Sequence, residues 1–330
     1  MSLWNKKPAL GIGIGVGVAG ALVLALRYGL RKTAREPIPD DISPAIFARR
    51  LSATTHGEMV YHISGSGQPV VFFHGIYVGA SSYEWSKVYP RLALTNEVIA
   101  PDLVGFGESE RPSATMDASD YAESMADFIL EVCGGVPPLV VASGLSAGIA
   151  LLMASRHPER VARLIVLLPT GLKGSGSWRA PGVGILARLP LMNRFVYRNY
   201  LSRPPFLRGW LSRFGMADSS HVTEEMVRNL AVCAQQAGAE NAILNFLKGR
   251  LAFDLAARLP RIPHPVTVLW PERAAGFPLR NGEQIARSLP LGELKVLPES
   301  GILAALESPD LVAQELMPDI PAAFRSDDVA

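Results

Sequence analysis

The chain has little cysteine. Cys133 and Cys233 are the two cysteines among 330 residues. Two isolated cysteines cannot form a disulfide framework, and no metal-ligand spacing surrounds them. We therefore predict that both are buried apolar residues in helices, and we expect neither a metal nor a cofactor.

A strong excess of charge of one sign is also missing. The chain has 32 basic and 30 acidic residues, and a net charge of +2 does not indicate a nucleic-acid partner. The length suits one large α/β domain with an insertion, or two small domains.

Acidic residues are absent between Arg160 and Ala217, whereas arginines recur. From residue 179 onward, the arginines in this stretch are Arg179, Arg188, Arg194, Arg198, Arg203, Arg208 and Arg213. Two interpretations stay open. The arginines are solvated on the surface of a lid, or they form a basic, aromatic face that contacts anionic lipid headgroups.

Charge is entirely missing from residues 9–26, ALGIGIGVGVAGALVLAL, which basic residues flank on both sides. Eighteen apolar residues at about 1.5 Å each are just long enough to cross a bilayer core. A secretory signal peptide is the alternative, but no clear A-x-A cleavage site follows. We predict an uncleaved single-pass membrane anchor over residues 1–32, with the globular part in the cytoplasm.

The same segment is rich in glycine. Residues 15–20 fit the pattern G-x-G-x-x-G, but this pattern indicates dinucleotide binding only after a strand in a βαβ unit. The pairs Gly11/Gly15 and Gly13/Gly17 would let helices approach closely, so self-association through the anchor is a hypothesis.

The rest of the chain alternates between strands and helices. Strands are predicted at 59–64, 69–75, 97–103, 139–143, 163–169, 266–270 and 293–297, with Gly65 to Gly67 as a turn between the first two. Helices are predicted at 81–93, 118–132, 147–157, 279–289 and after 304. This alternation indicates a mostly parallel sheet flanked by helices. The predicted parts are a linker and lead-in helix at 33–54, a core at 55–171 and 259–320, a helical lid at 172–258 and a tail at 321–330.

One short motif suggests catalysis. In VVASGLSAGIALL (140–152), an apolar strand runs into Gly144-Leu145-Ser146-Ala147-Gly148 and then into a helical stretch. G-x-S-x-G between a strand and a helix is the pattern of a nucleophile elbow. Ser146 is the candidate nucleophile, and it needs a base within hydrogen-bond reach.

With three other motifs, this segment resembles the α/β-hydrolase superfamily, in its lid-bearing branch of esterases, lipases and haloalkane-dehalogenase-like enzymes. The three are His74-Gly75 after the strand PVVFF, the turn DLVGFGES (102–109) and HPERV (157–161). The resemblance covers residues 55 to 318. It implies an α/β-hydrolase fold.

The resemblance also implies roles for particular residues. Ser146 would stand on the elbow, and the backbone N–H groups of Ile76 and Ala147 would form the oxyanion hole. His74 and Gly75 would shape the oxyanion loop, and Gly144 and Gly148 would shape the elbow.

The proton-handling positions of the family differ here. Ala274 stands where the family has its acid, and Ile302 stands where it has its histidine. Glu272, Glu299 and His221 are the candidate substitutes. Loss of the histidine in such enzymes costs about 10⁶ in kcat, so a conventional acyl-enzyme mechanism is not expected.

Three functions follow from these observations. The first is a membrane-anchored pseudo-hydrolase that binds a lipid-like ligand or a partner. The second is an atypical ester or lipid hydrolase that uses Ser146 with a non-standard base. The third is a membrane scaffold without a ligand.

Overall fold

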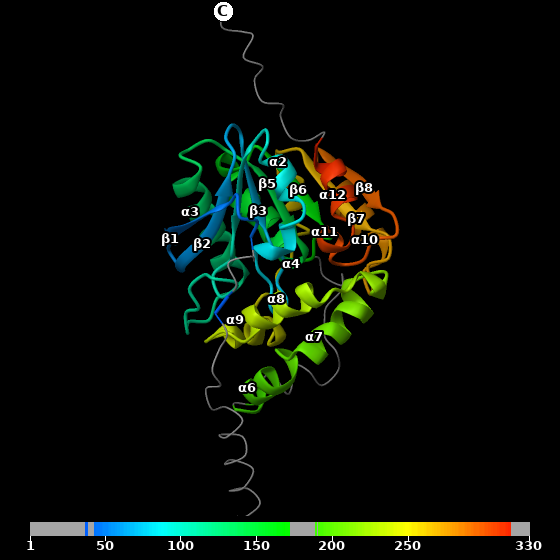
Figure 1. Cartoon of the computed structure of the whole chain (residues 1–330). Coiled ribbons are helices and arrows are strands. Elements are labelled where there is room, and N and C mark those ends of the chain that lie inside the picture. The colour runs from blue at the N-terminus through cyan, green and yellow to red at the C-terminus, as the bar shows by residue number, and fades with distance from the viewer. Residues whose placement is uncertain (1–36, 39–42, 172–188, 190, 318–330) are drawn as a thin grey trace, which may run out of the picture.

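The computed structural model of the chain describes residues 37–38, 43–171, 189 and 191–317 (Figure 1). The predicted anchor at 1–32, most of the linker, the first part of the insertion and the tail at 321–330 lie outside the described residues.

An eight-stranded sheet forms the centre of the described chain, in the order β1-β2-β4-β3-β5-β6-β7-β8. The strands are β1 (Ala48–Thr54), β2 (Gly57–Ser64), β3 (Pro69–Phe73), β4 (Glu97–Pro101), β5 (Leu139–Ser143), β6 (Arg163–Leu167), β7 (Val266–Pro271) and β8 (Gly292–Leu297). Strands β3 to β8 pair in parallel, whereas the β1–β2 and β2–β4 pairs are antiparallel. The central strands are apolar and buried on both faces, as expected where helices cover a parallel sheet. The predicted α/β architecture is confirmed.

The edge of the sheet differs from the prediction. Residues 48–54 form β1, so a lead-in helix is wrong for this part of 33–54. Strand β2 pairs with β1 and β4 rather than with β3. The hydroxyl of Thr54 donates to the carbonyl of Gly57 at 2.7 Å, which closes a tight β1–β2 turn. The hairpin supplies β1 as the hydrogen-bonding partner for the outer edge of β2. The pattern of apolar residues does not predict β1.

Helices cover both faces of the sheet. They are α2 (Tyr89–Leu92), α3 (Ala118–Val132), α4 (Gly144–Arg156), α10 (Leu279–Ser288), α11 (Ala304–Glu307) and α12 (Pro309–Leu316). The bounds of α3 are those predicted, because Asp117 and Asp120 form a capping box at its start. Cys133 and Cys233 are buried and free, as predicted, and burial raises the pKa of each thiol to about 12.

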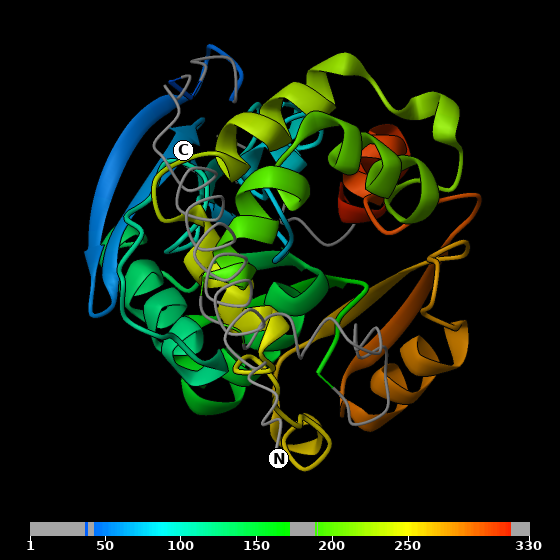
Figure 2. The same cartoon turned by 90° about the horizontal axis from the view of Figure 1, so that it is seen from below.

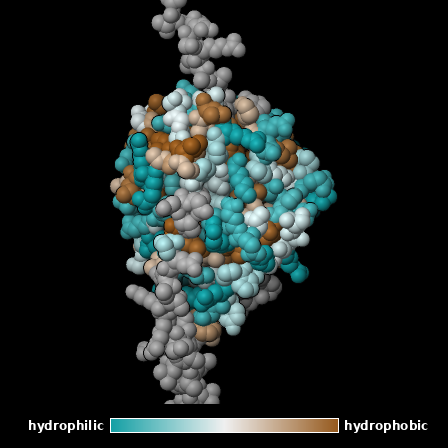
Figure 3. Space-filling view, in the orientation of Figure 1, coloured by the Kyte–Doolittle hydropathy of each residue, from teal (hydrophilic) through white to brown (hydrophobic). Residues whose placement is uncertain are grey.

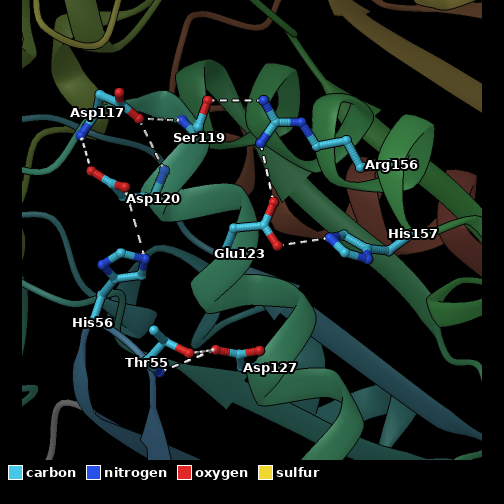
Figure 4. A network of polar contacts seen from close by, with 9 residues as sticks. All are labelled: Thr55, His56, Asp117, Ser119, Asp120, Glu123, Asp127, Arg156 and His157. Atoms are coloured by element: carbon cyan, nitrogen blue, oxygen red, sulfur yellow. Dashed lines mark hydrogen bonds and ion pairs between the residues drawn. The ribbon is translucent and has the colours of Figure 1, made fainter.

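A polar network ties the β1–β2 turn to α3 and α3 to the end of α4 (Figure 4). Thr55 donates to Asp127 through its hydroxyl and its N–H. Glu123 pairs with Arg156 at 3.1 Å and with His157 at 2.8 Å. His157 is therefore engaged at the carboxyl end of α4, away from the start of this helix.

A helical insertion, defined here as the described residues between β6 and β7 from 189 to 258, follows β6. Its helices are α6 (Met192–Val196), α7 (Pro204–Trp210), α8 (Glu224–Ala234) and α9 (Ala239–Leu247), and single π-helical turns follow α6 and α7. The helices gather at one end of the sheet (Figures 1 and 2). On the face seen in Figure 3, the surface at this end is mainly hydrophilic, whereas apolar residues gather at the opposite end.

The predicted membrane localisation needs correction. Among the helices of the described residues, none is long and apolar enough to cross a bilayer. On this finding the predicted localisation is wrong. The segment that suggested it, residues 9–26, lies outside the described residues.

Candidate active site

The turn between β5 and α4 lies at the carboxyl end of the sheet. Strand β5 ends at Ser143, and α4 begins at Gly144. Gly144 has a φ of 56°, a left-handed conformation that favours glycine. Within the described residues, nothing lies within 4 Å of the position that a Cβ of Gly144 would occupy. The sharp turn is therefore two residues earlier than the G-x-S-x-G pattern indicates, and no described atom fills the space beside it.

Ser146 lies in the first turn of α4, and its φ is not positive. Its side chain is fully buried, and its Oγ has no hydrogen-bond partner among the residues that the structure describes. An unsatisfied buried hydroxyl costs about 1–3 kcal/mol, so Ser146 does not stabilise the turn through its hydroxyl.

Gly148 supports the turn by close packing. A Cβ at this position would stand 1.7 Å from the carbonyl oxygen of Thr170, which follows β6. The N–H of Thr170 donates to the carbonyl of Gly144 at 3.2 Å. Because only glycine permits this approach, residues 144 and 148 fix the start of α4 against the segment after β6.

The loop after β3 is held by His74. Its Nε2 accepts a hydrogen bond from the N–H of Leu103 at 3.0 Å, which leaves the proton on Nδ1 to donate to the carbonyl of Gly75 at 2.7 Å. Burial lowers the pKa of His74, and the neighbouring Asp102 opposes this effect. A neutral His74 thus joins the loop after β3 to the loop after β4.

Asp102 organises the second loop through its carboxylate. It accepts from the N–H of Ser82 at 2.6 Å and from the N–H of Glu108 at 2.7 Å. Gly107 has a φ of 46°, and a Cβ there would stand 2.0 Å from the Asp102 carboxylate. The turn DLVGFGES is therefore a packing element in this fold.

Glu84 is a buried acid beside the turn. Its carboxylate accepts from the N–H of Gly75 at 2.7 Å and from the hydroxyl of Ser143 at 2.5 Å, and it also bonds to Tyr77. Burial raises the pKa of Glu84, and these hydrogen bonds partly offset the rise. Burial and the nearby Glu84 also raise the pKa of Tyr77. The cluster joins the loop after β3 to the last residue of β5.

Two backbone N–H groups remain for an oxyanion. The N–H of Gly75 is taken by Glu84, whereas that of Ile76 donates no hydrogen bond to any described residue. With Ser143 as the N-cap of α4, regular helix geometry directs the N–H of Ala147 to the Ser143 carbonyl. The N–H of Leu145 has no acceptor within the helix. Ile76 and Leu145 are therefore the geometric candidates, rather than Ile76 and Ala147.

The predicted acid and base positions carry apolar side chains in neighbouring loops. The N–H of Arg273 donates to the carbonyl of Ser300 at 3.0 Å, which brings the loops after β7 and β8 together. Ala274 is buried in the main core, and Ile302 packs against that core and against the insertion. Neither side chain can carry a proton.

None of the three substitute residues hydrogen-bonds to Ser146. Glu272 accepts from the N–H of Glu299, and Glu299 pairs with Arg273, all at the surface. His221 lies 3.5 Å from the carboxylate of Glu307. In the described part of the chain, therefore, no base contacts the hydroxyl of Ser146.

The helical insertion lies directly against the loop after β3. Tyr77 stacks on Trp210 of α7, with ring centroids 5.5 Å apart. A Cβ on Gly79 would stand 2.1 Å from the carbonyl of Leu230 in α8. The insertion and the oxyanion loop thus form one packed unit.

Two features of the site escaped the sequence analysis. Gly144 was assigned a supporting role because the G-x-S-x-G pattern drew attention to Ser146. Glu84 was treated as part of an ordinary helix at 81–93. A charged residue inside the apolar, aromatic run SYEW was the available signal of a buried acid.

The fold and this site together define an α/β hydrolase scaffold. A family model described as the alpha/beta hydrolase family matches residues 70–315, and the chain belongs to this family.

Named relatives cover different shares of the chain. The 2-hydroxymuconate semialdehyde hydrolase of Pseudomonas sp. strain CF600 is 38% identical over 112 residues, which are 34% of this chain and 40% of that enzyme. The uncharacterized hydrolase YugF of Bacillus subtilis is 25% identical over 267 residues, 80% of this chain and 94% of that protein. The chain spans 40% of the length of the first curated relatives it matches.

Solved structures agree on the fold. A membrane phospholipase A, a bacterial virulence factor, superposes with a TM-score of 0.69 at 23% identity, covering 94% of this chain and 96% of that one. This likeness concerns the fold alone.

Proposed function

We propose that this chain is a pseudo-hydrolase that binds a lipid-like ligand or a partner, and that the helical insertion acts as the lid of its binding site. The observation that carries the proposal is the empty turn at Gly144. A hydrolase of this fold presents its nucleophile on the strained strand-to-helix turn. Here that turn carries a glycine with a φ of 56°.

The acid and base positions support the same proposal. Ala274 and Ile302 replace ionisable side chains with hydrocarbon. With Gly144, all three members of a triad are then missing, while the N–H groups of Ile76 and Leu145 keep their positions. Backbone donors alone give about 10³–10⁴ over the uncatalysed rate, which is far below ordinary turnover.

The free space at Gly144 favours a ligand over chemistry. A carbonyl or carboxyl oxygen placed there would accept hydrogen bonds from the N–H groups of Ile76 and Leu145. Apolar side chains around Ile302 would accommodate a hydrocarbon chain. The proposed ligand class is therefore an apolar molecule with a terminal carbonyl or carboxyl group.

Ester hydrolysis by the full chain is the first test. We expect p-nitrophenyl butyrate to be cleaved at near-background rates by the wild type and equally by Ser146→Ala. Turnover above about 1 s⁻¹ in the wild type that vanishes in Ser146→Ala would instead establish the atypical serine hydrolase. Glu272, Glu299 and His221 would then be tested as bases.

A gain-of-function variant tests the position of the turn. Gly144→Ser with Ala274→Asp and Ile302→His should react with a fluorophosphonate probe, and the wild type should not. The matched variant adds only Ala274→Asp and Ile302→His and so relies on Ser146. Labelling of this matched variant at Ser146 would contradict the assignment of Gly144.

Ligand binding is tested by filling the space. Gly144→Trp should abolish binding of a fluorescent fatty acid such as cis-parinaric acid. Gly134 also has a positive φ, 59°, with nothing within 4 Å of a Cβ, but it lies on the exposed turn after α3. Gly134→Trp should leave binding unchanged. Equal binding by all three proteins would refute a ligand site at Gly144.

A further inference from the structure

A second cavity lies where the helical insertion meets the core. Its volume is about 310 Å³. Its walls come from the loop that precedes α3, from the start of α6 and from α9. In Figure 1, α6 and α9 both lie below the core, and neither Glu84 nor any of its hydrogen-bond partners lines the cavity.

Two cationic side chains line this cavity. They are Arg194 of α6 and Lys248, which follows α9. Among the described residues, no carboxylate lines it and neither cation forms an ion pair. Glu240 of α9 is turned to Arg198 instead, with Oε1 2.5 Å from Nη2, and its side chain is 4% exposed. The described walls of the cavity therefore carry two positive charges and no negative charge.

The remaining polar side chains of the cavity are amides and hydroxyls. Asn193 is buried, and its Oδ1 accepts from the N–H of Arg194 at 2.6 Å, which fixes the start of α6 beside the cavity. Asn241 and Asn245 line it from α9, and Ser113 and Thr115 line it from the loop. All of these groups can donate hydrogen bonds, as can both cations.

Leucines complete the wall of the cavity and restrict how polar a ligand can be along its whole length. Leu191 and Leu244 give the cavity a small apolar portion beside its donors. A ligand that fits must be compact and strongly acidic at one end, with several acceptor oxygens and a short carbon skeleton.

We propose that this cavity binds a phosphomonoester. A phosphomonoester has a charge of about −1.5 to −2 at pH 7 and three terminal oxygens, which match two cations and several neutral donors. The Arg194 guanidinium can bind two of these oxygens, and the Lys248 ammonium acts as a point charge. The site is distinct from the space at Gly144, so it goes beyond the proposed pseudo-hydrolase function and does not depend on it.

Calorimetric titration of the full chain with glycerol 3-phosphate tests the proposal. We expect saturable binding in a one-to-one ratio, and no binding of glycerol. Arg194→Gln and Lys248→Gln should each weaken binding about tenfold, the loss expected for one charge-assisted hydrogen bond. Arg208→Gln is the matched control, because Arg208 lies on the same insertion, pairs with Glu224 and does not line the cavity. This control should bind like the wild type.

The proposal is wrong if glycerol 3-phosphate does not bind, or if the three variants bind equally well. Circular dichroism of Arg194→Gln and Lys248→Gln shows whether a loss of binding reflects a loss of fold. Binding by the wild type should also tighten from about pH 5 to pH 7, as the phosphate loses its second proton with a pKa of about 6. No change over this range would contradict a phosphomonoester.

A second titration identifies the source of the phosphate group. Dibutyryl phosphatidic acid has the same headgroup as glycerol 3-phosphate and adds two short acyl chains. Tighter binding of this lipid would identify a lipid headgroup as the ligand. Equal or weaker binding would identify a free phosphate ester. In either case the losses in Arg194→Gln and Lys248→Gln should persist.

Discussion

The candidate site has two halves: one keeps the backbone geometry of a hydrolase site, and the other lacks its ionisable side chains. The half at the start of α4 is built from backbone, with the Gly144 turn, the N–H groups of Leu145 and Ile76, and the contact of Gly148 with Thr170. The half in the loops after β7 and β8 would be built from side chains, and Ala274 and Ile302 leave it apolar.

The difference between the halves has a physical cause. The backbone half is required for folding, because the strand-to-helix turn must fit against the segment after β6. The side-chain half contributes to folding only by packing, and hydrocarbon packs as well there as a charged pair does, without a desolvation cost. A scaffold can therefore lose its proton-handling groups and keep its oxyanion geometry.

The largest effect should come from Gly148. In Gly148→Ala the new Cβ would stand 1.7 Å from the Thr170 carbonyl oxygen, and backbone must move. We expect a loss of about 3 kcal/mol or more in the free energy of unfolding, measured by urea denaturation.

Gly144→Ala is the matched control for this prediction. Its methyl group meets free space, so only the positive φ opposes it, at about 1–2 kcal/mol. An equal loss in both variants would mean that close packing does not set the turn.

Glu307 should give the next largest effect. This buried carboxylate accepts from the N–H groups of Ala217, Asp218 and Gly301 at 2.7 to 3.0 Å, and so ties the insertion to the turn before Ile302. In Glu307→Gln the amide NH₂ group would face backbone donors, and we expect a loss of about 2 kcal/mol in unfolding free energy by urea denaturation. A loss below about 0.5 kcal/mol would show that other contacts hold the insertion in place.

Glu84 should change the pH dependence of stability. Because burial raises its pKa in the folded state, the folded protein binds more protons than the unfolded chain, and stability falls as pH rises through this range. Glu84→Gln has no such proton. The melting temperature of the wild type should therefore fall relative to that of the variant as pH rises above 4.5, the ordinary pKa of a glutamate. Parallel melting curves at all pH values would show that Glu84 keeps its ordinary pKa.

Asp310 should give the smallest effect. Its carboxylate pairs with Arg91 on the surface, and the two side chains are 76% and 57% exposed. Asp310→Asn should change the unfolding free energy by about 0.5 kcal/mol or less, because solvent screens exposed pairs. Measuring Asp310→Asn beside Glu307→Gln compares the contribution of an exposed carboxylate with that of a buried one. A large loss would mean that exposed charges also hold α12 on the sheet.

Much of the fold could be predicted from periodicity. The bounds of α3 and β5 follow from the Asp117 cap and from a run of apolar residues that ends in glycine. Strand β1 could not be predicted in this way, since it is mostly exposed and owes its pairing to a tight turn with β2.

The candidate site was less accessible to sequence reasoning. The absence of ionisable groups at Ala274 and Ile302 could be read from the residues, because the motifs around them fix the register. Which residue stands on the sharp turn could not be read from the sequence, because Gly144 and Ser146 both fit a pattern of small residues. The conformation of one glycine distinguishes them.

The turn at Gly144 also bears on how such a chain can change over generations. The space around its Cβ position accepts a side chain, whereas Gly148, one helical turn further along α4, does not. At position 144 a serine side chain would meet no described atom within 4 Å of its Cβ, so only the positive φ opposes it. The same turn therefore has room for a new side chain where a hydrolase of this fold presents its nucleophile, and has none four residues later, where the helix meets the segment after β6.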